Sequence, residues 1–169
     1  MKKKAIIFPM LFLIFILQSC SGIKRNYFAE GNSMRSNNDV EGAINAYTKA
    51  IGQNSNSDSA YFFRGVSYKA KGMLDKAMAD YSKAIELNPK YEEALMTRAA
   101  EYSTAKKYTE SIADYSKVIE LNPKNGKAWM SRGVVYFANK QADKCCPDWK
   151  KAKELGEAEA DDLLIENCK

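Results

Sequence analysis

The stretch Ala60–Tyr91, AYFFRGVSYKAKGMLDKAMADYSKAIELNPKY, recurs along most of the chain. A shift of 34 residues brings four copies into register without a slip. One aligned column holds small residues: Gly31, Gly65, Ala99 and Gly133. Another holds aromatic residues: Tyr47, Tyr81, Tyr115 and Trp149. A fixed period of this length is typical of stacked helical units, none of which can bury its apolar face alone.

Each copy has the spacing of two short helices. In Ala60–Tyr91, aromatic and small residues recur three or four positions apart on both sides of Gly72, and Pro89 follows the second run. This pattern resembles the tetratricopeptide repeat (TPR) and covers residues 24–159. The resemblance implies an all-α, right-handed superhelical solenoid of four helix-turn-helix repeats with a C-terminal capping helix. The expected repeats are 24–57, 58–91, 92–125 and 126–159, and the expected cap is 160–169.

The N-terminal segment carries an export signal. Lys2, Lys3 and Lys4 precede the apolar run Ala5–Leu17, which is shorter than the roughly 20 residues a spanning helix needs. We therefore expect a signal peptide over 1–19. Its end, LQSC, resembles the bacterial lipobox, which implies lipidation of Cys20, a short tether over 20–23 and a place on the periplasmic side of the outer membrane. Ordinary secretion to a soluble periplasmic form is the alternative.

The composition argues against an enzyme. The chain has no histidine, and its 26 basic residues nearly balance its 21 acidic ones once the three N-terminal lysines are removed. There is no glycine-rich phosphate loop and no paired Cys-x-x-Cys motif. Cys145, Cys146 and Cys168 lack a fourth ligand for zinc. We expect no catalytic residue, no cofactor, no metal and no nucleic-acid partner. An enzyme or small-ligand binder that uses a pocket between the repeats remains the alternative.

The resemblance also implies a binding surface. In TPR proteins the first helix of each hairpin lines a concave groove. The positions this assigns to partner binding are Phe28, Asn32, Phe62, Phe63, Val66, Met96 and Met130. The alternative is that these side chains pack between adjacent hairpins. Of the residues of the carboxylate clamp that grips acidic C-terminal tails, only Asn32 is present, or only Lys127 if the clamp starts one repeat later, so the clamp is absent. The expected function is that of an adaptor for a protein or peptide partner, in envelope assembly.

The last repeat departs from the pattern in two ways. Pro147 is tolerable if Asp143 is the N-cap of its helix. Cys146 shares its column with apolar residues that should face the next helix, and Cys168 follows Leu164 by four positions on that helix. Because exported compartments are oxidising, these positions predict a Cys146–Cys168 disulfide. Secreted TPR proteins with similar endings support it, and three reduced thiols are the alternative.

Overall fold

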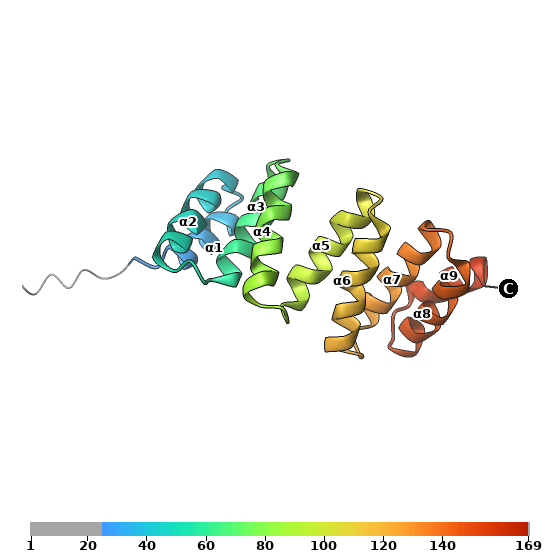
Figure 1. Ribbon diagram of the computed structural model, residues 1–169. Coiled ribbons are helices and arrows are strands. Elements are labelled where there is room, and N and C mark those ends of the chain that lie inside the picture. The colour runs from blue at the N-terminus through green and yellow to red at the C-terminus, as the bar shows by residue number, and fades with distance from the viewer. Residues whose placement is uncertain (1–24, 169) are drawn as a thin grey trace, which may run out of the picture.

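The chain folds into an elongated array of antiparallel helix pairs, shown in Figure 1 as a computed structural model that describes residues 25–168. The helices of this part are α1 (Tyr27–Ser36), α2 (Val40–Gln53), α3 (Asp58–Ala70), α4 (Leu74–Leu87), α5 (Glu92–Thr104), α6 (Tyr108–Leu121), α7 (Gly126–Ala138), α8 (Ala142–Glu154) and α9 (Glu159–Asn167). Residues 25–168 contain no strand. The predicted all-α TPR solenoid is confirmed, with one helix pair in each expected repeat and α9 after the last pair.

Successive hairpins stack along the array, from α1 and α2 at one end to α8 and α9 at the other (Figure 1). Within residues 25–168 no helix combines the length and the apolar character that crossing a membrane would need. The expected signal peptide, the tether and Cys20 lie outside the described residues.

The small-residue column allows the two helices of a hairpin to approach closely. A Cβ atom added at Gly65 would lie 2.8 Å from the ring of Tyr81. At Gly133 the same atom would lie 2.5 Å from the indole of Trp149. Both aromatic residues are fully buried, so any larger side chain at the glycine would displace the central aromatic ring of its hairpin.

The turn inside each hairpin uses one left-handed residue at the same position. Its φ angle is 60° at Asn38, 77° at Gly72, 58° at Lys106 and 58° at Lys140. Only Gly72 adopts this conformation without a steric cost, which is about 1 kcal/mol or more for other residues. In the other three repeats, packing of the helix pair therefore imposes the turn.

An arginine ladder links neighbouring repeats. Each arginine donates two hydrogen bonds of 2.8 Å to a buried aspartate in the second helix of its own hairpin: Arg64 to Asp80, Arg98 to Asp114 and Arg132 to Asp148. It also donates to a hydroxyl group of the preceding repeat: Thr48, Ser82 and Ser116 respectively. The aspartate raises the pKa of each guanidinium group. The first repeat has Glu30 in place of the arginine and Ala46 in place of the aspartate, so the first arginine–aspartate pair is in the second repeat.

The expected start of α8 is wrong. Its N-cap is Gln141 rather than Asp143, so Pro147 lies inside the helix. Proline has no amide hydrogen, and the carbonyl oxygen of Asp143 therefore receives no helical hydrogen bond from that residue. The helix continues to Glu154 nevertheless, because Trp149 and Ala152 anchor it in the core.

Candidate functional site: a cavity between α5, α7 and α9

A cavity of about 470 Å³ opens between the first helices of the third and fourth repeats and the closing helix α9. Its walls are formed by Ala100 and Ser103 of α5, Tyr115 of α6, Met130, Ser131, Val134 and Val135 of α7, and Glu159, Asp162 and Leu163 of α9. First helices were expected to line the binding groove. A wall contributed by α9 was not expected, because that segment was assigned only the role of a cap.

The cavity combines an apolar wall with an acidic rim. Met130, Val134 and Leu163 supply apolar surface, and Glu159 and Asp162 supply two carboxylates. Val134 remains 43% exposed although it lines the cavity. Phe137, three residues further along α7, packs on Trp149 of α8 instead. A large apolar side chain left open in a cavity wall is typical of surfaces that bind a partner. The arrangement can hold an apolar group and a neighbouring cation.

Of the residues expected to bind a partner, Met130 lines this cavity. Met96 is half-buried and packs against the core on both sides of α5. Val66 is half-buried against the core of the second repeat. The structure therefore brings Met130 together with residues that were not singled out, and it places Met96 and Val66 largely within the packing between hairpins.

The remaining aromatic positions form a cluster in the first two repeats. The rings of Phe28 and Phe63 lie 5.9 Å apart, and Phe63 also stacks on Tyr47 at 6.1 Å. The guanidinium group of Arg35 lies 4.8 Å from the centre of the Phe63 ring. Phe28 and Phe63 are both half-buried, so their main contacts are with each other and with the hairpin core.

Phe62 is not part of the expected groove. It is 2% exposed and packs on Tyr81 and Tyr91, at 5.8 Å and 5.1 Å between ring centres. It is therefore a core residue, and its assignment to the partner-binding surface is wrong. The reason is the loop before α5: Tyr91 closes over the position, and Ala94 of α5 joins the same buried cluster.

Asn32 has an internal partner. Its side-chain oxygen accepts a hydrogen bond of 2.7 Å from the hydroxyl group of Tyr47. Val66 occupies the same column in the next repeat, and the hydroxyl group of Tyr81 there is buried without a partner. Burial, with smaller contributions from Glu101 and Asp80, raises the pKa of Tyr81 to about 12. Asn32 thus satisfies a buried polar group, a role that its place in the column did not reveal.

The stacked helix pairs and the residues that recur every 34 positions define a helical-repeat solenoid. A cavity lined by its first helices opens on the surface. Two family models match, "Tetratricopeptide repeat" over residues 59–91 and "TPR repeat" over 31–72 and 99–140. Together these matches span more than half of the chain. The chain belongs to the tetratricopeptide-repeat family.

Several solved structures have a similar fold. The MamA protein is 23% identical, with a TM-score of 0.71 over 76% of this chain and 70% of that one. A tetratricopeptide repeat protein from Parabacteroides merdae is 19% identical, with a TM-score of 0.74 over 79% and 54%. The first TPR of Spaghetti (RPAP3), bound to the HSP90 peptide SRMEEVD, is 25% identical, with a TM-score of 0.63 over 68% and 90%. No curated protein matches the chain.

Proposed function

We propose that this chain is a non-catalytic scaffold that holds a protein or peptide partner in the cavity between α5, α7 and α9. The observation that carries the proposal is the apolar surface of α7 in this cavity, where Met130 and Val134 both line the wall and Val134 is still 43% exposed. A side chain inserted there would bury apolar surface at about 25 cal/mol per Å². A related fold, the first TPR of Spaghetti, is seen with a bound peptide, which supports this mode of use.

The acidic rim restricts the partner. Glu159 and Asp162 would repel an anionic segment and favour one that places lysine or arginine beside an apolar side chain. An acidic tail such as SRMEEVD therefore does not suit this cavity, in agreement with the missing carboxylate clamp. The partner we propose is a cationic, partly apolar segment of a protein.

The proposed binding cavity is tested by substituting two of the residues that line it. The double variant Met130→Ser and Val134→Ser should recover at least tenfold less of the partner from envelope extracts, because truncated hot-spot residues typically cost about 2 kcal/mol or more. Lys150→Ser, an exposed change on α8, is the matched control. Equal recovery by both variants would contradict the proposal. Turnover of a small substrate without any captured protein would favour an enzyme instead.

We further propose that the protein is an outer-membrane lipoprotein that faces the periplasm and acts in envelope assembly. The support is the sequence LQSC that ends at Cys20, together with the run of lysines and apolar residues before it. Two or more acyl chains give a durable anchor at about 0.8 kcal/mol per buried methylene group. The tether over 20–23 would then hold the first repeat close to the membrane.

The anchor has its own test. Cys20→Ala should either release the protein into the soluble fraction or leave an unprocessed precursor, as detected by fractionation and by labelling with palmitate. Cys145→Ala, which changes a buried thiol far from the N-terminus, should do neither. A Cys20→Ala protein that is processed and fractionates as before would exclude lipidation and favour a soluble periplasmic scaffold.

A further inference from the structure

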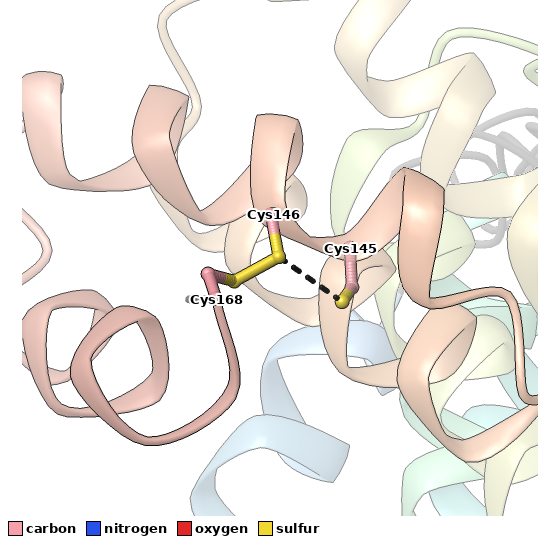
Figure 2. A group of neighbouring side chains, drawn as sticks. All are labelled: Cys145, Cys146 and Cys168. Carbon is pink, nitrogen blue, oxygen red and sulfur yellow. Dashed lines mark hydrogen bonds between the residues drawn. A yellow bond between two sulfur atoms is a disulfide. The ribbon is translucent and has the colours of Figure 1, made fainter.

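Three cysteine sulfur atoms converge between α8 and the end of α9 (Figure 2). Cys146 and Cys168 form a disulfide, the pairing expected from the sequence. Cys145 keeps a free thiol whose sulfur lies 3.9 Å from that of Cys146. All three sulfur atoms lie within 4.8 Å of one another, and no other group of three potential metal ligands in residues 25–168 comes so close.

The cluster is separate from the cavity, since none of its residues lines that site. The cluster also contains one sulfur atom more than a disulfide uses. Cys145 is fully buried in the column that holds Ala43, Ala77 and Ser111 in the other repeats, so a small inert residue would suffice for packing. A third sulfur at this position gives the site a chemistry that the disulfide alone does not have.

The spacing suits a metal ion with three sulfur ligands. With metal–sulfur bonds of about 2.3 Å, three sulfur atoms in a trigonal arrangement lie ~4 Å apart. Cys145 and Cys146 already have this separation. Cys168 is the C-cap of α9, outside its helical turns, so it can draw back from Cys146 once the disulfide is reduced.

We propose that the reduced form of this chain binds one thiophilic ion, of the class represented by Cu(I), through Cys145, Cys146 and Cys168. Soft thiolate ligands select such ions, and Cu(I) accepts three sulfur ligands where tetrahedral zinc requires a fourth. The disulfide and the bound ion are then alternative states of one site. The oxidised cluster, in which Cys145 is the one thiol left, does not bind.

The chemistry balances in two steps. A dithiol reductant gives two electrons and two protons to the Cys146–Cys168 bond, which breaks into two thiols while the reductant becomes a disulfide. The ion then displaces one proton from each of the three thiols, forms three metal–sulfur bonds and keeps its oxidation state. Because binding releases three protons, the affinity for the ion should increase with pH.

The experiment uses the full chain with Cys20→Ser, so that only the clustered cysteines supply thiols. The protein is reduced with dithiothreitol, desalted without oxygen and titrated with Cu(I) against a coloured Cu(I) chelator. We expect one tightly bound ion per reduced chain and none per oxidised chain. Failure of the reduced chain to bind, or equal binding by the oxidised chain, would overturn the proposal.

Variants separate a three-sulfur site from a pair of thiols. Cys145→Ser keeps the disulfide pair, and Ser111 shows that serine is accommodated at this position. Its reduced form should bind Cu(I) at least tenfold more weakly, as should reduced Cys168→Ser. Circular dichroism checks that each variant remains helical. If Cys145→Ser binds as tightly as its parent, only two cysteines hold the ion and the three-sulfur site is refuted.

Discussion

At the scale of single residues, equivalent tyrosines in neighbouring repeats have opposite hydrogen-bonding states. The hydroxyl group of Tyr47 donates to Asn32, whereas that of Tyr81 is buried without a partner. A buried unsatisfied group costs about 1–3 kcal/mol. We therefore expect Tyr81→Phe to increase the free energy of unfolding by about 1 kcal/mol and Tyr47→Phe to decrease it by a similar amount. Urea denaturation followed by circular dichroism measures both.

The same tyrosine predicts a pH dependence. The pKa of Tyr81 is about 12 in the folded chain, against an ordinary value of 10.0. Its ionisation therefore leaves the free energy of unfolding unchanged below pH 10 and lowers it as the pH rises from 10 towards 12, because the unfolded chain releases the proton first. Tyr81→Phe should lose less stability than the wild type over this interval. An unchanged alkaline slope, or a destabilised Tyr81→Phe protein, would contradict the unpartnered hydroxyl group.

The arginine ladder gives a second prediction at this scale. Arg98→Met should destabilise the protein by about 3 kcal/mol, because it leaves Asp114 as a buried charge that is only 7% exposed. Lys117→Met, which breaks an exposed pair with Glu120, should cost less than about 0.5 kcal/mol. Chemical denaturation compares the two variants. Equal decreases in the free energy of unfolding would show that an arginine–aspartate pair of the ladder stabilises the fold no more than a surface ion pair does.

At the scale of the elements, α9 depends on its covalent link. Apart from the disulfide, it is held by the buried Ala160, by the half-buried Leu163 and Leu164, and by an exposed pair between Lys153 and Asp161. Closure of a loop of 22 residues stabilises by roughly 3 kcal/mol. Cys168→Ser should therefore increase hydrogen exchange in the amides of α9 and weaken partner binding, because α9 forms one wall of the cavity.

The matched control is Cys145→Ser, which leaves the disulfide intact. It should leave exchange in α9 and partner binding unchanged. If Cys168→Ser also left both unchanged, non-covalent packing alone would position α9. If instead exchange increased while binding persisted, α9 would not be part of the binding site.

The helices were predictable from the sequence, and the cavity was only partly so. Helix positions follow from local spacing that recurs every 34 residues, so each copy reinforces the others. Phe62 was misplaced because its column borders both the groove and the packing between hairpins, and only the fold shows that Tyr91 covers it. The wall formed by α9 depends on how this short helix packs against the last repeat. No other repeat in the described part of the chain has an equivalent helix, so the aligned positions could not predict it. The ladder could have been read from its aligned arginines and aspartates.

At the scale of the whole molecule, the stacked repeats support the proposed binding site. The ladder ties the second, third and fourth repeats together, and α9 closes the end that carries the cavity. If these contacts keep the first helices in place before a partner arrives, the ordering cost of binding is reduced. The central claim is that partners contact this surface of α7 and not the opposite side of the array.

Site-specific photo-crosslinking tests that claim most directly. A benzoylphenylalanine residue is placed at Val134 beside the cavity or at Lys150 on the exposed surface of α8, and the protein is irradiated in envelope extracts. We expect a discrete protein adduct from position 134 and none from position 150. An adduct from position 150 with none from position 134 would contradict a partner-binding cavity between α5, α7 and α9.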